Sequence, residues 1–206
     1  MQDFAPFAGR EKELERLTQY LEKALDYSGG FALISGKIGV GKTRLLNQFI
    51  NGIDSRSLHI LHGRVIKDEI KPFSPFTQMI EHYLCNLEHN RSWLVKFLEP
   101  EIAPYFAHLI PELRNHYPLD IPDLAYPLDN LSFVYSFQRF FENLSRSKPL
   151  VLILDDIQWM SGESVELLKY LVRRISGQPA LFLATARSHE ENPELQTTID
   201  DFNTDR

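Results

Sequence analysis

A glycine-rich octapeptide that directly follows a short apolar run constrains the fold of this chain more than any other stretch. The run Phe31–Ser35 is typical of a buried strand, and residues 36–43 read Gly-Lys-Ile-Gly-Val-Gly-Lys-Thr. Glycines in such a turn let successive backbone N–H groups face an anion without Cβ clashes, and the positive end of the following helix points at the same anion. The order of strand, loop and helix therefore indicates a phosphate-binding loop rather than an ordinary glycine-rich turn.

The side chains of this loop match the chemistry of a nucleotide with its metal ion. Lys42 can reach the β- and γ-phosphates as a point charge, and the Thr43 hydroxyl can ligate Mg²⁺. The predicted cofactors are therefore ATP or ADP with Mg²⁺, although the sequence does not distinguish adenine from another base. The candidate nucleotide-binding residues of the loop are Gly36, Lys37, Ile38, Gly39, Val40, Gly41, Lys42, Thr43 and Arg44.

A second apolar run supplies candidate carboxylates. Leu150–Leu154 is apolar at every position, as expected of a central parallel strand covered on both faces, and it is followed by Asp155 and Asp156. Carboxylates at the carboxyl end of such a strand lie where ligands bind in open α/β sheets. We expect Asp155 to hold Mg²⁺ through water, and Asp156 to orient or deprotonate the attacking water. Taken alone the pair fits a helix cap or a surface turn equally well, and the phosphate-binding loop is what favours the metal site.

Arginines stand at the ends of two predicted elements in the last third of the chain. Residues 180–186 predict another buried strand, which delivers Arg187 to the same edge of the sheet as a candidate γ-phosphate sensor. The alternative for Arg187 is an ordinary cation just past a strand. Arg173 and Arg174 are interpreted as solvated cations in the last turn of a helix, with an arginine finger acting on a neighbouring molecule as the alternative. The candidate catalytic residues are Asp156, Lys42 and Arg187.

Gly9 and Arg10 stand immediately before a predicted amphipathic helix with leucines at helical spacing. The dipole of that helix disfavours a cation at its start, so Arg10 is either merely solvated or has an anionic partner on the nucleotide side. We include Gly9 and Arg10 among the candidate nucleotide-binding residues.

Prolines interrupt the alternation of strands and helices in the middle of the chain. Helical pieces between Trp93 and Leu113 are broken by prolines, and the stretch to Pro127 is a proline-punctuated loop. We therefore predict one core domain over residues 1–206, with a helical insertion at about residues 90–128.

Composition restricts the compartment and the partners. The chain has 206 residues, of which 43% are hydrophobic, enough for one α/β domain with a sizeable core. Its net charge of −6 argues against a surface that coats nucleic acid. The single cysteine cannot form an internal disulfide, and neither a signal peptide nor an apolar run long enough to span a bilayer is visible. We expect a cytoplasmic protein without membrane contact or direct nucleic-acid binding.

Four motifs together resemble the STAND branch of the AAA+-like ATPases. They are Phe-Ala-Gly-Arg-Glu-Lys-Glu-Leu at residues 7–14, the loop ending Gly41-Lys42-Thr43-Arg44-Leu45, Asp155-Asp156-Ile157-Gln158-Trp159, and Thr185-Ala186-Arg187. The resemblance implies a three-layer α/β/α P-loop NTPase fold of the ASCE type with a mostly parallel sheet. Its strand order would be 5-1-4-3-2 in the full domain and 1-4-3-2 here, because the chain ends before the family's fifth strand and helical lid. The resemblance also implies Lys42, Thr43, Asp155, Asp156 and Arg187 at the nucleotide.

Several functions are compatible with this resemblance. It implies the ATPase domain of a large signalling or transcription regulator, and we expect this chain to be a fragment of such a protein. The first interpretation is an ATP-binding, slowly hydrolysing switch that acts on further domains of the same polypeptide or on a signalling partner. The alternatives are a nucleotide-binding scaffold that does not hydrolyse, and an ATPase acting on DNA and related to the origin-recognition ATPases, which share the Gly-Arg pattern. A small-molecule kinase is disfavoured because residues 90–128 contain only Arg91 and Arg114 as arginines.

The predicted strand order has a consequence for association. The strand at residues 31–35 would be an edge of the sheet, because residues 188–206 lack the apolar run of another strand. One row of its backbone N–H and C=O groups would then be unpaired, so we expect self-association through this strand.

Overall fold

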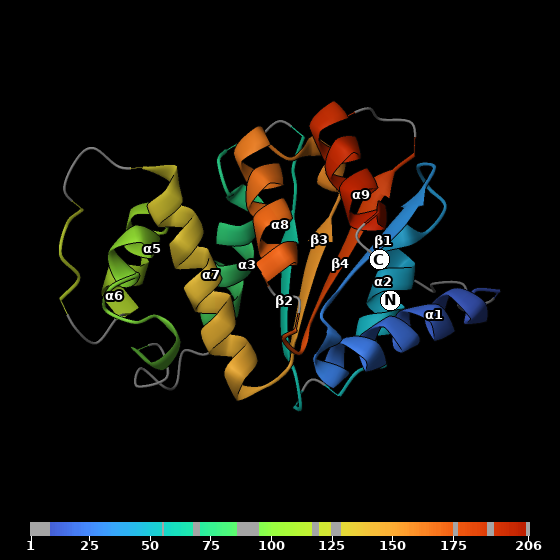
Figure 1. Ribbon diagram of the computed structural model, residues 1–206, viewed down its shortest axis with the longest axis horizontal. Helices are drawn as coiled ribbons and strands as arrows, with labels where there is room; N and C mark the ends of the chain where they lie inside the picture. The colour runs from blue at the N-terminus through green and yellow to red at the C-terminus, as the bar shows by residue number, and fades with distance from the viewer. Residues whose placement is uncertain are drawn as a thin grey trace, which may run out of the picture.

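A computed structural model describes residues 9–54, 56–67, 71–85, 95–116, 120–124, 129–174, 177–188 and 192–204. Within these residues one parallel sheet of four strands forms the centre of the molecule, in the order β1-β4-β3-β2 (Figure 1). The strands are β1 (Gly30–Gly36), β2 (His59–Arg64), β3 (Leu150–Asp155) and β4 (Ala180–Arg187). The predicted order 1-4-3-2 is confirmed, and β1 and β2 are the edges of the described sheet.

Eight α-helices of the described residues surround this sheet or pack on the helices next to it. They are α1 (Glu11–Lys23), α2 (Lys42–Asn51), α3 (Ser74–Cys85), α5 (Ala103–Leu109), α6 (Leu113–His116), α7 (Asn130–Ser147), α8 (Gly162–Arg174) and α9 (Pro193–Thr204). A π-helical turn, Ala24–Ser28, extends α1, and a 3-10 turn, Ile157–Trp159, follows β3. Over the described residues, none of the helices combines the length and the apolar character needed to cross a bilayer.

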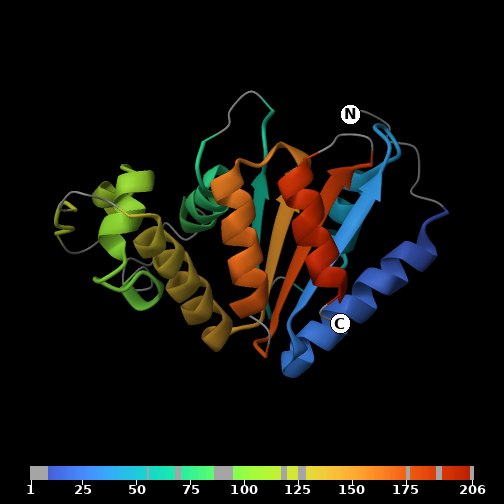
Figure 2. The same ribbon diagram turned by 45° about the horizontal axis from the view of Figure 1, so that its top comes forward.

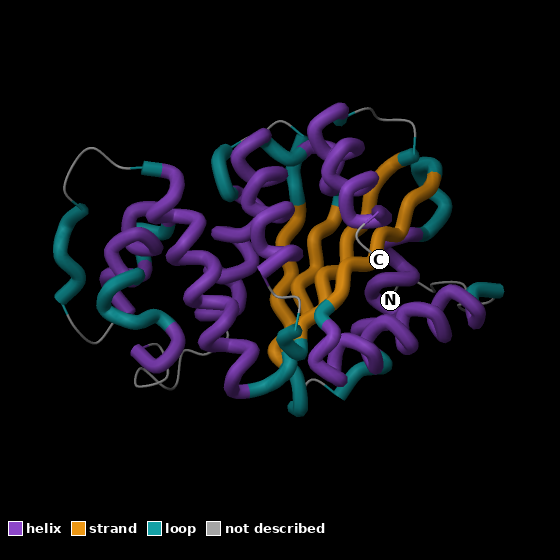
Figure 3. The backbone as a smooth tube through the Cα atoms, in the orientation of Figure 1, coloured by secondary structure: helices purple, strands orange, loops and turns teal. Residues whose placement is uncertain are grey.

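Two hydrophobic clusters, one on each face of the sheet, hold the layers together. Helices α1 and α2 pack on one face through Leu17, Leu21, Leu45, Leu46 and Phe49. The other face lies against α3, α7, α8 and α9 in a larger cluster rich in phenylalanine. Figures 2 and 3 show α8 and α9 side by side over the sheet. The arrangement is the predicted α/β/α sandwich.

Strand β3 lies at the centre of this sandwich and is buried at every position. Its side chains alternate between the layers: Leu152 and Leu154 join the larger cluster, whereas Val151 and Ile153 join the cluster of α1 and α2. The uninterrupted apolar run is therefore the sequence of a strand with no face in water, as predicted.

Helix α9 was not among the predicted elements. The prediction that residues 188–206 form no strand is confirmed for their described part, which forms α9 after β4. The Phe202 ring lies 4.8 Å from the Phe31 ring of β1, measured between centroids. The sequence does carry a signal for α9, because Leu195, Ile199 and Phe202 recur at helical spacing after Asn192 and Pro193, but these residues were considered only as a possible strand.

Two basic side chains tie α8 to α9. Lys169 Nζ lies 2.9 Å from Asp201 Oδ2, and Arg173 Nη2 lies 3.6 Å from the same oxygen. Arg174 instead donates from Nε to the hydroxyl of Tyr170 at 3.3 Å. These contacts give Arg173 and Arg174 partners within the chain, and the choice between solvated last-turn cations and an arginine finger stays a prediction.

The predicted insertion joins the main core where the structure describes it. Both of its expected boundaries, 90 and 128, fall outside the described residues. Between them, α5 and α6 lie at the end of the molecule far from α1 (Figure 1). The Phe106 ring of α5 packs 5.2 Å from Phe137 and 5.4 Å from Phe140, both on α7. The domain boundaries stay a prediction, since the described part shares its packing with α7.

Gly63 marks a close approach between β2 and the start of α3. A Cβ atom at this position would lie 2.1 Å from the carbonyl oxygen of Pro75 and 3.2 Å from the terminal methyl of Met79. We expect Gly63→Ala to lower the free energy of unfolding by about 1–3 kcal/mol, because the helix backbone must shift. Urea denaturation measures this. Gly52→Ala is the control, since its Cβ would make only ordinary contacts, and an equal effect of both changes would contradict the reasoning.

A buried histidine should make the stability depend on pH. His59 is 5% exposed, with Nδ1 2.7 Å from the Tyr83 hydroxyl and Nε2 2.7 Å from Ser147 Oγ. Burial first, and then the charges of Lys148 and Lys96, lower the pKa of His59 from 6.5 to about 4. Between these values the unfolded chain binds the proton more tightly, so stability falls as the pH falls from 6.5 towards 4.

We expect this histidine to remove about 2 kcal/mol of unfolding free energy between pH 7 and pH 5. Urea denaturation at both pH values measures the loss, and His59→Gln should reduce it. The same change at the exposed His108 serves as the control. A pH dependence that is the same in His59→Gln and in the unchanged protein would refute this role of His59.

Candidate functional site

The glycine-rich loop joins the end of β1 to the start of α2 at the carboxyl edge of the sheet. Gly39 and Gly41 have φ of 78° and 86°, in the left-handed region that favours glycine. The buried Lys42 donates from Nζ to the carbonyl oxygens of Gly36 at 2.9 Å and Lys37 at 3.1 Å. The loop therefore curves around its own lysine, as a phosphate-binding loop requires.

The two predicted metal ligands lie next to each other. Thr43 Oγ1 donates to Asp155 Oδ2 at 3.2 Å, although the two residues are 112 positions apart in the sequence. The other oxygen of Asp155, Oδ1, accepts a short hydrogen bond from the Thr185 hydroxyl of β4. Asp155 is 1% exposed, and among the described residues no lysine or arginine forms an ion pair with it. A buried carboxylate whose described hydrogen bonds come from two hydroxyls is suited to receive a divalent cation.

Asp156 occupies a different environment from that of its neighbour. Its backbone is left-handed, with φ of 60°, and its N–H donates to Thr185 Oγ1 at 3.0 Å. The carboxylate lies between two guanidinium groups: Arg64 Nη2 is 3.4 Å from Oδ2, and Arg187 Nε is 3.6 Å from Oδ1. Gln158 Nε2 also donates to Oδ1, at 3.2 Å. The two adjacent aspartates thus have separate partners, which allows separate roles.

An aromatic ring extends this cluster of charges. Trp159 lies in the 3-10 turn after β3, with Lys67 Nζ 4.2 Å from its ring centroid. The guanidinium carbon of Arg187 lies 5.7 Å from the same ring. Arg187 therefore contacts both the Trp159 ring and the carboxylate of Asp156, and Lys67 adds another cation at that ring, so positive charge accumulates at this edge of the sheet.

The amino-terminal pair touches the loop from outside. Arg10 donates a short hydrogen bond from Nη2 to the carbonyl oxygen of Val40, so its partner in this structure is the loop itself. The Gly9 N–H donates to Glu11 Oε1 at 3.2 Å. Arg44 is exposed in the first turn of α2, and Ile38 is 74% exposed at the tip of the loop. These positions leave the nucleotide-binding roles of Gly9, Arg10 and Arg44 as predictions.

The structure brings Lys42, Thr43, Asp155, Asp156 and Arg187 to one edge of the sheet, which is where we expected them. Sequence reasoning gave no role to three residues that bond to the aspartates: Arg64, Gln158 and Thr185. Gln158 and Thr185 stand inside motifs already identified, within three residues of a predicted site residue. The contact of Arg64 with Asp156 could not be predicted along the chain, because it depends on the parallel pairing of β2 with β3.

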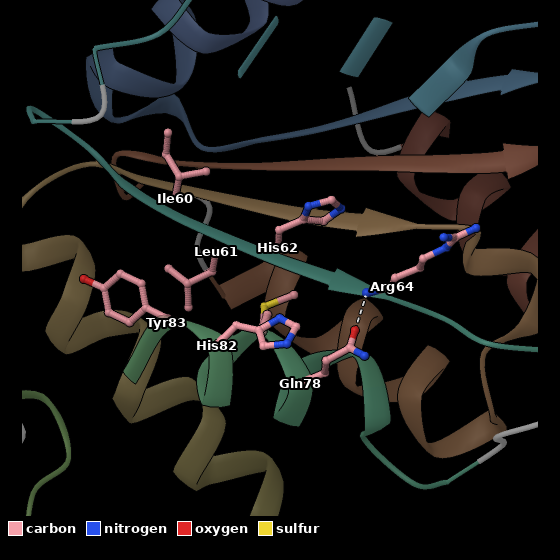
Figure 4. Close-up of a pocket in the computed structure, with 8 residues that line it drawn as sticks. Ile60, Leu61, His62, Arg64, Gln78, His82 and Tyr83 are labelled. Carbon is pink, nitrogen blue, oxygen red and sulfur yellow. Dashed lines mark hydrogen bonds between the residues drawn. The ribbon is translucent and has the colours of Figure 1, made fainter. Parts of the chain in front are cut away.

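A separate cavity of about 600 Å³ lies between β2 and α3. Figure 4 shows Gln78 of α3 pointing at the backbone of Arg64, whose N–H donates to Gln78 Oε1 at 2.7 Å. Two histidines, His62 and His82, line the same cavity, and burial lowers the pKa of His62. No group of three potential metal ligands occurs in the part of the chain that the structure describes.

Comparison with known proteins agrees with this geometry. The family model of the AAA ATPase domain matches residues 6–183. The hybrid signal transduction histidine kinase G of Dictyostelium discoideum is 25% identical over 180 residues, which cover 79% of this chain and 5% of the kinase. The similarity therefore concerns a small part of a much longer protein.

Solved structures with the same fold include two from archaea. Cdc6p of Pyrobaculum aerophilum has a TM-score of 0.55 and 13% identity, and the match covers 98% of this chain and 46% of that chain. The Orc1 protein of Aeropyrum pernix, solved in complex with DNA, has a TM-score of 0.52 and 18% identity, and the match covers 97% of this chain and 46% of that chain. At these identities the likeness concerns the fold alone.

Proposed function

The chain belongs to the AAA ATPase domain family, and we propose that it binds Mg-ATP and Mg-ADP as a STAND-type regulatory switch of a larger signalling protein. The observation that carries this proposal is the contact of 3.2 Å between Thr43 Oγ1 and the buried Asp155, at the foot of the glycine-rich loop. The similarity to a segment of a histidine kinase supports the signalling context. In this proposal residues 1–206 form one P-loop core with a helical insertion, in a cytoplasmic protein.

The glycine-rich loop would bind the phosphates of the nucleotide, and the pair Thr43 and Asp155 would bind its metal ion. Lys42 would exchange its contacts with the loop carbonyls for the β- and γ-phosphates, while the loop N–H groups and the start of α2 hold the same phosphates. Thr43 and Asp155 would hold Mg²⁺, which supplies positive charge to the phosphate oxygens when bound.

Hydrolysis would depend on Asp156. In this step the oxygen of a water molecule bonds to the γ-phosphorus, the bond from phosphorus to the ADP oxygen breaks, and Asp156 accepts the proton of the water. The contacts of this carboxylate with Arg64 and Arg187 compete with the water for its oxygens. We therefore expect slow turnover, with Arg187 turning from Asp156 to the γ-phosphate.

The same ion pairs favour a second candidate, a nucleotide-binding scaffold that does not hydrolyse. If Arg64 and Arg187 keep their contacts with the Asp156 carboxylate after ATP binds, they hold it away from the attacking water and hydrolysis does not proceed. Action on DNA, as for the origin-recognition ATPases, draws support from the shared fold only, and the net charge of −6 counts against it.

Nucleotide binding is tested by replacing the loop lysine. Lys42→Ala should weaken binding of Mg-ADP and Mg-ATP by about 2 kcal/mol or more, because a charge that contacts the phosphates is lost. Isothermal titration calorimetry measures both affinities. Lys12→Ala, an exposed lysine of α1, should bind as the unchanged protein does. Equal affinities in Lys42→Ala and Lys12→Ala would refute the assignment of the loop.

Turnover is tested by replacing the proposed base. Asp156→Asn should keep nucleotide binding and lose most of the ATPase rate, because an amide cannot accept the proton of water as a carboxylate does. Phosphate release under saturating Mg-ATP measures the rate, with the substitution Asp26→Asn at an exposed aspartate of the π-helical turn as control. An unchanged rate in Asp156→Asn would remove this residue from the mechanism. Binding without turnover in the unchanged protein would favour the scaffold.

A further inference from the structure

The side chain of Gln158 connects Asp156, the proposed base, to Arg187, the proposed γ-phosphate sensor. It lies in the 3-10 turn after β3 and is 5% exposed, so its polar atoms need partners inside the protein. Nε2 donates to Asp156 Oδ1 at 3.2 Å. Oε1 accepts the backbone N–H of Arg187 at 3.1 Å. One planar amide therefore joins the carboxylate of Asp156 to the last residue of β4.

Asp156 needs this kind of support because its backbone leaves β3 in a left-handed conformation. The Thr185 hydroxyl fixes the N–H of Asp156, which sets the backbone but not the direction of the carboxylate. Three side chains act on that direction: Arg64, Arg187 and Gln158. Gln158 differs from the other two in being neutral.

The difference in charge matters once a nucleotide is present. Guanidinium groups are attracted to phosphate oxygens, so the contacts of Arg64 and Arg187 with Asp156 compete with the γ-phosphate. A neutral amide has little such attraction, and the Arg187 N–H holds its Oε1 in place. Gln158 is therefore the contact that can still direct the carboxylate when the arginines turn to the ligand.

The turn that carries Gln158 is itself held from outside. Asn192, just before α9, donates from Nδ2 to the carbonyl oxygens of Gln158 at 3.3 Å and Met160 at 3.4 Å. Its Oδ1 accepts the N–H of Leu195 at 3.1 Å, which caps the first turn of α9. The backbone of the turn is thus fixed to β3 on one side and to α9 on the other.

We propose that Gln158 is a positioning residue that directs the Asp156 carboxylate at the attacking water. The assignment rests on the proposed function, since it deepens the hydrolytic role given to Asp156. An apolar side chain at this position would leave the Arg187 N–H without its acceptor, and a glutamate would place a second carboxylate against Asp156. Both changes should misdirect the base without touching the glycine-rich loop.

Two substitutions and a matched control test the assignment. Gln158→Leu and Gln158→Glu should lower kcat for ATP hydrolysis roughly tenfold or more. The KM for ATP and the Kd for Mg-ADP should stay within about twofold, because these depend on the loop. Gln138→Leu is the control: Gln138 also makes two side-chain hydrogen bonds, with Glu142 and Tyr170, and lies on α7 away from the site. We expect its kcat to equal that of the unchanged protein.

A double substitution separates positioning from a general structural effect. In the Asp156→Asn background, Gln158→Leu should change the residual rate by less than about twofold, because its effect passes through the lost carboxylate. If Gln158→Leu does not fold, Gln158→Glu decides, since it has nearly the same size and still accepts the Arg187 N–H.

The outcomes distinguish the two proposals. Unchanged kcat in both Gln158 variants overturns the positioning role and leaves hydrolysis standing. The same fold loss with and without Asp156 also overturns it, because Gln158 would then act independently of the base. If the protein without substitutions binds Mg-ATP in calorimetry but releases no phosphate, the hydrolytic part of the proposed function is overturned. The positioning role of Gln158 is then overturned as well.

Discussion

Parallel pairing of the strands brings the polar residues of this protein to one edge of its sheet. Because β1, β3 and β4 run in the same direction, the glycine-rich loop, the paired aspartates and Arg187 all follow strand ends on the same side. Asp155 shows what this produces: a carboxylate inside the protein, bonded by a hydroxyl from α2 on one oxygen and a hydroxyl from β4 on the other. The cost of burying that charge is tolerable if a cation joins it, so the fold and the proposed ligand support each other.

Sequence patterns predicted the parts of this structure that depend on local order. The loop glycines, the uninterrupted apolar strand and the position of Asp155 after it are all readable along the chain, and the sheet order followed from the family resemblance. The ion pair of Asp156 with Arg64 could not be predicted from the sequence. The two residues are 92 positions apart, and only the pairing of β2 with β3 brings them together. Helix α9 was missed for a different reason: Leu195, Ile199 and Phe202 stand at helical spacing, but this segment was considered only as a possible strand, and its contact with β1 through Phe202 required the fold.

The two aspartates illustrate how neighbours in sequence can differ in chemistry. Both carboxylate oxygens of Asp155 accept hydrogen bonds from hydroxyls, an environment that suits a metal ion. The carboxylate of Asp156 instead forms ion pairs with two arginines that a phosphate can attract. A bound γ-phosphate would therefore change the surroundings of Asp156 more than those of Asp155. The turn of Gln158 connects that change to α9 through Asn192, which gives the proposed switch a physical route from the nucleotide to the outer helical layer.

The left-handed backbone of Asp156 also bears on how this protein can evolve. Asparagine adopts that conformation at least as readily as aspartate, so the local fold would accept the exchange without strain. Aspartate and asparagine codons differ by one base. A hydrolysing switch and a binding-only scaffold would then be separated by one mutational step that leaves the backbone intact, and a lineage could cross between these states in either direction while keeping the rest of the domain.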